Sequence, residues 1–170
     1  MIRKKKMYLR PNQPFEKSRI DEENILVKQF ALKNKKEIWK ALAKVNYFRG
    51  RAKALANLPL EQQEVLFNKL KAIGLNTNNT ADVLDLKVED ILSRRLPTIV
   101  ASKGIANTPK HARQLVAHKK IMLNNRVVDS PSYLVSVSEE NSIKLKVKSK
   151  KPKAKPVEEQ PIEETTEDSE

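Results

Sequence analysis

Apolar side chains recur at helical spacing along the first half of the chain. Between Phe15 and about Leu32, Ile20, Val27 and Phe30 fall on one face of a helix. Acidic residues crowd the first turns of this segment, where the helix dipole favours negative charge: Glu16, Asp21, Glu22 and Glu23. The pattern predicts a first helix that ends near Leu32.

The strongest helical pattern begins after Asn34. Asn34 and Glu37 have the spacing of a capping box, in which each side chain satisfies a free backbone N–H of the other. Apolar residues then recur at steps of three and four and predict a buried stripe: Ile38, Leu42, Val45, Phe48, Ala52 and Leu55. Another face carries a polar series: Lys40, Lys44, Tyr47 and Arg51, with Arg49 and Lys53 near the same end.

Prolines, a glycine and a threonine mark where the next predicted helices begin and end. Pro59 is placed to open a third helix that buries Leu66, Leu70 and Ile73, and Gly74 is placed to stop it. Thr80 is placed to cap a short helix through Leu86. Val88, Ile91 and Leu92 predict a helix that reaches Leu96, where Pro97 either kinks it or begins a new segment.

Short strands follow the last predicted helix. Thr108 and Pro109 form a cap and a first-turn proline, and Ala112, Leu115 and Val116 predict the apolar side of a helix that ends near His118. Two apolar runs, 121–123 and 127–128, bracket Asn124-Asn125-Arg126, and the asparagine pair tolerates the positive φ angles of a tight hairpin. Ile143, Leu145 and Val147 alternate with lysines, which predicts a half-buried strand with one basic face. Helices followed by strands predict the α+β class.

The charge of the chain points to a nucleic-acid partner. Its 170 residues contain 34 Lys and Arg against 21 Asp and Glu, a net charge of +13. Residues 1–156 hold all 34 basic residues and 14 of the acidic ones, so their formal charge is +20. The surplus, with the interleaved Tyr47, favours an RNA-facing stripe on the second helix over an ordinary solvated face.

Both ends of the chain have biased compositions. Residues 1–14 predict an extended basic arm that orders against phosphate, and a disordered tail is the alternative; its cations are Arg3, Lys4, Lys5, Lys6 and Arg10. Residues 148–170 predict a disordered basic linker followed by an acidic tail.

Several protein classes conflict with the composition. A membrane surface is the competing partner for a basic chain, but no run approaches the roughly 18 apolar residues of a spanning helix, and no apolar stretch follows the basic start. We therefore expect a soluble protein that is not secreted. With no cysteine and two histidines, His111 and His118, we expect no metal site and no cofactor.

Residues 94–147 carry a motif pattern that resembles the alpha-L type RNA-binding module. The matching stretches are Arg94-Arg95-Leu96, Gly104-Ile105-Ala106, Thr108-Pro109-Lys110, Ala112-Arg113-Gln114-Leu115-Val116, His118, Ile121, Asn124, Val127-Val128 and Ser130-Pro131-Ser132-Tyr133. This resemblance implies a small fold of two helices packed on a short bent antiparallel sheet. It implies RNA contacts from the second helix and neighbouring loops, by position from Thr108, Lys110, Arg113, Gln114, His118, Lys119 and Lys120. We add as candidate RNA ligands Arg94, Arg95, Asn124, Asn125 and Arg126.

The rest of the chain selects a branch of this superfamily. Phe15-Glu16-Lys17, the run from Leu32 to Trp39, and Arg49-Gly50-Arg51-Ala52 resemble the archaeal and eukaryotic type of small ribosomal subunit protein four. The resemblance implies a helical rRNA-binding domain at residues 15–93 and the module at 94–147. It also implies binding to a multi-helix junction of small-subunit rRNA, early assembly, an influence on decoding accuracy, and a cytoplasmic, ribosome-bound location. Neighbouring ribosomal proteins are the implied partners, protein five among them.

Four residues depart from the family pattern. Lys119-Lys120 and Asn125 stand where relatives usually have glycine, and a lysine in a left-handed turn costs about 1 kcal/mol relative to glycine. Pro97 stands where the family often has an acid or an amide, so the continuity of the helix at Leu96 is open.

No catalytic site emerges from the sequence. The aspartates of the helical half lie near helix starts, and the glycines, Gly50, Gly74 and Gly104, are too far apart for a phosphate loop. We therefore expect no enzyme and no small-molecule substrate. A transient RNA chaperone or ribosome-rescue factor with the same module is the alternative function, and an adaptor that acts through its acidic tail is a third.

Overall fold

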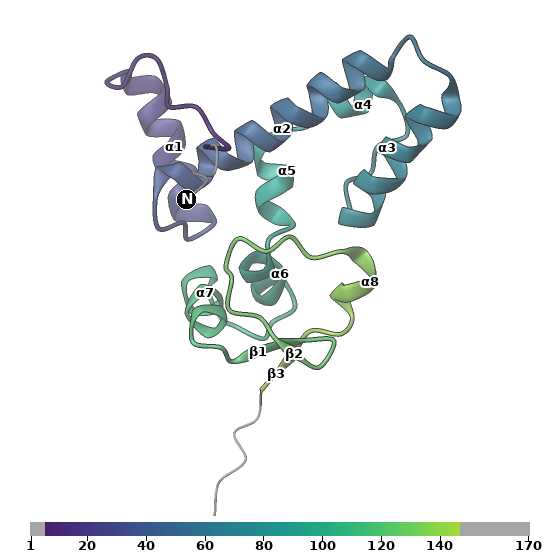
Figure 1. Cartoon of the computed structure of the whole chain (residues 1–170). Helices are drawn as coiled ribbons and strands as arrows, with labels where there is room; N and C mark the ends of the chain where they lie inside the picture. The colour runs from purple at the N-terminus through teal and green to yellow at the C-terminus, as the bar shows by residue number, and fades with distance from the viewer. Residues whose placement is uncertain (1–5, 147–170) are drawn as a thin grey trace, which may run out of the picture.

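The computed structural model describes residues 6–146 and has two parts (Figure 1). An upper, helical part is joined to a smaller part that contains a three-stranded sheet, which confirms the α+β class. Arg3, Lys4 and Lys5 of the predicted arm, Val147, and the predicted linker and tail at 148–170 lie outside the described residues. None of the helices within 6–146 combines the length and the apolar character needed to cross a membrane.

Helix α2 is the axis of the helical part. It spans Lys35–Leu55 and contacts the four other helices: α1 (Lys17–Gln29), α3 (Leu60–Ile73), α4 (Thr80–Asp85) and α5 (Val88–Ser93). Four of the predicted stripe residues are buried, namely Ile38, Val45, Phe48 and Ala52. The prediction is wrong for Leu42, which is 43% exposed. The stripe is turned toward Ala41 instead, because α5 packs on that side of α2.

Glu23 has a different role from the one its position predicted. It is not in the first turn of α1, and only 6% of its surface is exposed. Its carboxylate accepts hydrogen bonds from Arg19 Nη1 at 2.7 Å and Trp39 Nε1 at 2.9 Å, and Lys35 Nζ lies 3.4 Å away. Burial raises the pKa of Glu23, but these donors outweigh it and hold the pKa below 4.5. Glu23 therefore links α1 to α2.

The sequence motifs predicted some helix ends correctly and others wrongly. Gly74 ends α3 at φ +88°, as predicted, while Pro59 is the cap of α3 rather than its first residue. The cap of α4 is Asn79 rather than Thr80, and its N–H donates to Asp82 Oδ2 at 3.1 Å. The capping box at Asn34 is wrong, because the Asn34 side chain makes no cap hydrogen bond.

Helix α5 stops at Ser93, three residues before the predicted end. The next helix, α6, spans Leu96–Ser102 and holds Pro97 in its first turn, so the alternative in which Pro97 begins a new segment is confirmed. Its missing N–H costs nothing there. Between the helices the backbone pairs with a distant segment: Leu96 N–H donates to Tyr133 O at 2.9 Å, and Val135 N–H to Arg94 O at 3.1 Å.

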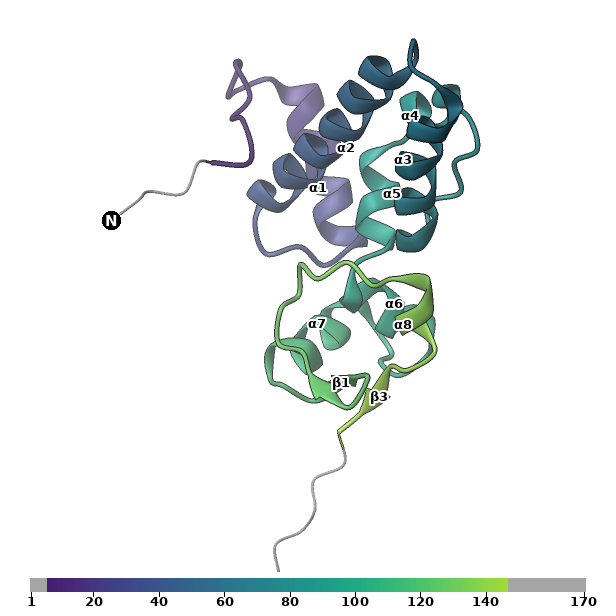
Figure 2. The ribbon, with the colours of Figure 1, turned by 45° about the vertical axis from the view of Figure 1, so that its right-hand side comes forward.

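The smaller part packs two helices on the sheet, as the resemblance implied (Figure 2). Helix α6 lies against α7 (Pro109–Ala117), and the strands β1 (Ile121–Leu123), β2 (Arg126–Val127) and β3 (Lys144–Leu145) are antiparallel in the order β2-β1-β3. A short helix, α8 (Val137–Glu140), precedes β3. The core of this part is separate from that of the helical part and is centred on Leu96, Val100, Ala112, Val116, Ile121 and Val135.

Two local predictions for this part are confirmed and one is wrong. Thr108 Oγ1 accepts a hydrogen bond from His111 N–H at 3.2 Å, which caps α7. Asn124 and Asn125 have φ angles of 46° and 63° in the hairpin between β1 and β2. The strand near residue 145 exists, but Leu145 is 48% exposed, because β3 is short and lies at an edge of the sheet.

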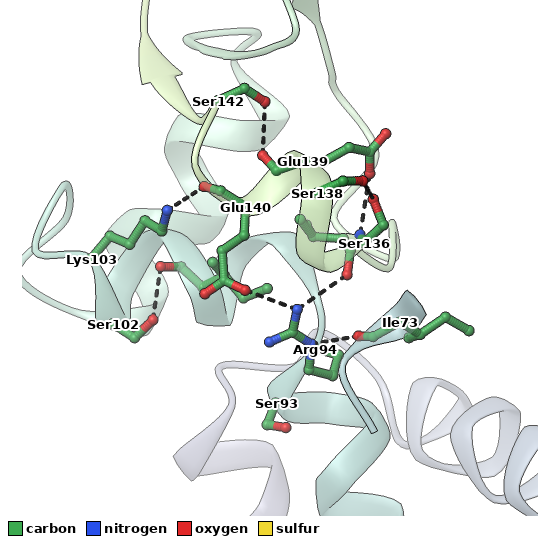
Figure 3. Close-up of polar contacts among 12 residues, drawn as sticks. Ile73, Ser93, Arg94, Ser102, Lys103, Ser136, Ser138, Glu139, Glu140 and Ser142 are labelled. Atoms are coloured by element: carbon green, nitrogen blue, oxygen red, sulfur yellow. Dashed lines mark hydrogen bonds and ion pairs between the residues drawn. The ribbon is translucent and has the colours of Figure 1, made fainter. Parts of the chain in front are cut away.

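Arg94 fills the junction between the two parts (Figure 3). Its Nε donates to Ile73 O at the end of α3, at 2.7 Å, and its Nη2 contacts Glu140 Oε2 of α8 at 3.0 Å. Nη2 also lies 3.4 Å from Val135 O. One guanidinium thus connects an end of the helical part to two segments of the smaller part.

The described residues of the predicted arm contact the helices. The rings of Tyr8 and Trp39 have centroids 6.2 Å apart, and Lys40 Nζ lies 6.0 Å from the centre of the Tyr8 ring. Arg19 Nη2 donates to the carbonyls of Gln13 and Pro14, at 3.0 Å each. Tyr8, Gln13 and Pro14 of the arm therefore have partners within the protein, while Lys6 and Arg10 are exposed.

Candidate nucleic-acid interface

The first basic surface is one face of α2, which we define as Lys40, Lys44, Tyr47 and Arg51. All four residues are exposed, and Tyr47 exposes 57% of its surface. At about 100° per residue they share one sector of the helix, beside the sector that carries the core of the helical part. Lys53 is also exposed, but it lies about 200° around the helix from Arg51 and does not belong to this surface.

Arg49 does not belong to this surface. Its Nη2 donates to Leu86 O at 2.7 Å, and the side chain is partly buried. Arg49 therefore ties α2 to the residue that follows α4, a contact across 37 positions of sequence.

The second basic surface lies on the smaller part, on α7 and the β1–β2 hairpin. We define it as Thr108, Lys110, Gln114, His118, Lys119, Lys120, Asn124, Asn125 and Arg126, all of which are exposed. The Thr108 hydroxyl caps α7, so the other side chains of this surface are the ones available to bind a ligand. Lys119 Nζ lies 3.7 Å from Asp129 Oδ2, a contact between exposed groups that water and salt weaken.

Lys119 stands in a backbone conformation that favours glycine. Its φ is 57°, and Lys119→Gly is expected to raise the free energy of unfolding by about 1 kcal/mol, because glycine adopts the left-handed region without a Cβ penalty. The matched control is Lys120→Gly, which removes the same charge at a position without positive φ and is expected to lower stability. Urea denaturation of both variants checks this, and a destabilised Lys119→Gly would contradict it.

Besides Arg49, three further predicted RNA ligands make contacts inside the protein. Arg94 lies in the junction described above. Arg95 is only 6% exposed, and its Nη2 donates to Glu37 Oε2 at 2.6 Å. Arg113 donates hydrogen bonds to the same carboxylate from both terminal nitrogens, Nη2 to Oε1 at 2.7 Å and Nη1 to Oε2 at 3.1 Å. These contacts use part of the hydrogen-bonding capacity of the three guanidinium groups that were predicted to bind RNA.

The Glu37 cluster, which we define as Glu37, Arg95 and Arg113, joins the two parts. Glu37 comes from the first turn of α2, Arg95 from the cap of α6 and Arg113 from the middle of α7. Burial raises the pKa of Glu37, but the hydrogen bonds and charges of Arg113 and Arg95 outweigh it and hold the pKa below 4.5. Glu37 is therefore ionised at neutral pH and fixes α2, with the first surface, to α7, with the second.

Sequence reasoning missed this cluster. Glu37 is 58 residues from Arg95 and 76 from Arg113, and no local spacing reports on such a distance. The one available indication was a glutamate in a run of basic residues, and the capping-box motif offered a nearer explanation for it.

Comparison with known proteins gives consistent matches. The S4 domain family model matches residues 94–141. The chain is 42% identical over 152 residues to the small ribosomal subunit protein uS4 of Methanocella arvoryzae, a match that covers 82% of this chain and 74% of the relative. The protein of the same name from Nanoarchaeum equitans is 40% identical, with 85% of each chain covered, and that from Methanothermobacter thermautotrophicus is 43% identical, with 82% of this chain and 85% of the relative covered.

Proposed function

Because the chain belongs to the uS4 family of small ribosomal subunit proteins, we propose that it is a structural, RNA-binding component of the small ribosomal subunit. Its relatives are named as ribosomal proteins and not as enzymes. The resemblance found in the sequence is therefore confirmed at the level of the family. Ribosomal RNA and neighbouring ribosomal proteins are the corresponding partners, and the ribosome in the cytoplasm is the corresponding location.

The finer proposal is that the protein is a primary binder of a multi-helix junction of small-subunit rRNA. The observation that carries it is the Glu37 cluster, which holds two exposed basic surfaces at a fixed separation. Two surfaces on a rigid frame suit a folded junction, in which neighbouring helices present phosphates in a fixed arrangement. Such a binder would act early in assembly and influence decoding accuracy, with protein five as one candidate neighbour. In this proposal residues 15–93 form one rRNA-binding domain and residues 94–147 another.

The salt dependence of RNA affinity tests whether both surfaces bind at once. Arg51→Gln changes the first surface and Lys110→Gln the second, and each is expected to flatten the plot of log K against log salt by about 0.7–0.9 per lost phosphate contact. The double variant is expected to show the sum, because the sites do not share partners. The measurement is filter binding of a small-subunit rRNA junction fragment across a range of KCl concentrations.

The matched control is Lys71→Gln, an exposed lysine of α3 outside both surfaces, for which the slope should not change. A double variant no flatter than either single variant would mean that one surface alone contacts the RNA. Co-sedimentation of the protein with small subunits in equal amounts, at moderate salt, separates a resident component from a transient chaperone or rescue factor. Substoichiometric, stress-dependent association would contradict the proposal.

The acidic tail bears on a further alternative, the adaptor. Deletion of residues 157–170, which contain seven acids and no Lys or Arg, is expected to leave rRNA affinity nearly unchanged. An adaptor that acts through this tail would lose its main activity instead.

A further inference from the structure

A cleft of about 360 Å³ lies between α2 and the smaller part. Its charged lining consists of five cations from three segments and one acid: Lys36, Lys40 and Lys44 of α2, Arg95, Arg113 and Glu37. Pro131, Ser132 and Leu134 of the smaller part also line the cleft. Lys40 and Lys44 belong to the first basic surface as well, so the cleft continues that surface toward the smaller part and is itself strongly positive.

The single acid leaves most of this charge uncompensated. Glu37 already accepts hydrogen bonds from both Arg95 and Arg113, so its one negative charge is shared between two guanidinium groups. The three lysines of α2 have no carboxylate among the residues that line the cleft apart from Glu37. One negative group entering the cleft would meet four excess positive charges.

The surroundings of Lys44 disfavour its positive charge. Burial lowers the pKa of Lys44, and the positive charge of Arg95 lowers it further. The residue as a whole is exposed, so its ammonium group is reachable from solvent while it lies within the field of Arg95. An anion placed beside both groups would relieve their repulsion, whereas a neutral ligand would not.

We propose that this cleft binds one phosphodiester group of an RNA strand, held by Lys44 together with Lys40 and the guanidinium groups of Arg95 and Arg113. The inference rests on the proposed RNA-binding function and deepens it, because it places a phosphate between the two basic surfaces. A strand that runs from the outer face of α2 to α7 passes the mouth of the cleft. Lysine suits this position as a compact charge with rotatable donors, while the paired arginines keep their fixed contacts with Glu37.

The test uses the full chain and three probes. Inorganic phosphate and dimethyl phosphate are titrated against the protein while the lysine side-chain resonances are followed by NMR, and the rRNA junction fragment is titrated by filter binding. Dimethyl phosphate stands for the backbone diester, and inorganic phosphate for a free or terminal group. The variants are Lys44→Gln, the charge-preserving Lys44→Arg and the control Lys71→Gln, and a thermal melt of each confirms that it folds.

Both small probes are expected to shift the Lys44 resonance saturably in the parent protein, and Lys44→Gln is expected to abolish binding of the two probes in the cleft. For the RNA fragment, Lys44→Gln should weaken affinity about 10- to 100-fold and flatten the salt slope by about 0.7–0.9, the loss of one charge-assisted phosphate contact. Lys44→Arg should restore most of the affinity, and Lys71→Gln should match the parent.

Two results would overturn the proposal while the proposed function stands. One is that Lys44→Gln binds the RNA fragment with the same affinity and salt slope as Lys71→Gln. The other is a cleft that takes inorganic phosphate but not dimethyl phosphate, which would assign it to a free or terminal phosphate instead of a backbone group. If the parent protein does not bind the RNA fragment at all, the proposed function itself is wrong.

Discussion

Replacement of Glu37 by alanine is expected to lower the free energy of unfolding by about 3 kcal/mol, because it leaves the buried Arg95 without its carboxylate. Arg113 loses both of its hydrogen bonds to the same group and keeps only a 3.4 Å contact with Ala31 O. The two parts should also become free to move relative to each other, since the cluster spans them. Urea denaturation followed by circular dichroism measures the loss of stability.

The control for this substitution is Glu61→Ala, which removes an exposed acid from the first turn of α3 and should cost only a few tenths of a kcal/mol. The functional readout is the salt slope for the rRNA fragment, measured well below the melting temperature. If Glu37 positions the surfaces, the folded variant should contact fewer phosphates and give a flatter slope. A variant that is unstable but binds with an unchanged slope would show that the cluster contributes to stability alone.

Acid should have the same effect as the substitution. The pKa of Glu37 is held below 4.5 in the folded protein, so its contribution to stability is complete above 4.5 and is lost as the pH falls through the folded value. Glu23 behaves in the same way, since its pKa is also lowered. In urea titrations below pH 5 the parent protein should therefore lose stability more steeply than Glu37→Gln, and parallel curves would contradict this assignment.

The second large effect is expected from Gly74→Ala, with a loss of about 2–3 kcal/mol. A Cβ at this position would lie 2.5 Å from Arg94 Cζ and 2.6 Å from its Nε, and the φ of +88° adds backbone strain. The guanidinium must move, which breaks its hydrogen bond with Ile73 O and its ion pair with Glu140 (Figure 3). Denaturation in urea measures the change.

Gly104→Ala is the matched control for Gly74→Ala. Its φ is +72°, but a Cβ there would meet no atom within 4 Å, so the variant should cost only about 1 kcal/mol of backbone strain. The difference between the two variants therefore reports on Arg94. Equal losses would mean that the guanidinium moves aside freely and that the junction does not depend on it.

Signals that act within a few residues predicted the local structure well. Thr108 caps α7, Gly74 stops α3 and the asparagine pair forms the hairpin, because each depends on backbone geometry that the residue itself determines. Pro97 begins a helix for the same reason. The capping-box motif at Asn34 and Glu37 failed because two distant arginines hold the Glu37 carboxylate.

The predicted RNA ligands divide into exposed cations and cations bound inside the protein. The lysines of both basic surfaces are exposed, as are Arg51 and Arg126, and the lysines on α2 lie where the helical periodicity placed them. The arginines Arg49, Arg94, Arg95 and Arg113 instead make internal contacts, because the planar guanidinium satisfies several acceptors at once in a partly buried place. The number of positive charges along the sequence cannot distinguish exposed cations from internally bound ones, since the acceptors of these arginines lie 21 to 82 residues away.

The two cores occupy consecutive stretches of the chain, Leu32–Leu92 and Leu96–Ile143. During synthesis all the buried residues of the first core are present before the second has emerged, so the helical half should begin to fold first. Its closing contacts come late: Leu134 packs against the first core only once the polypeptide has turned back past Arg95. A nascent chain halted before Arg95 would contain all of α2, but its Glu37 would have neither Arg95 nor Arg113 as a partner.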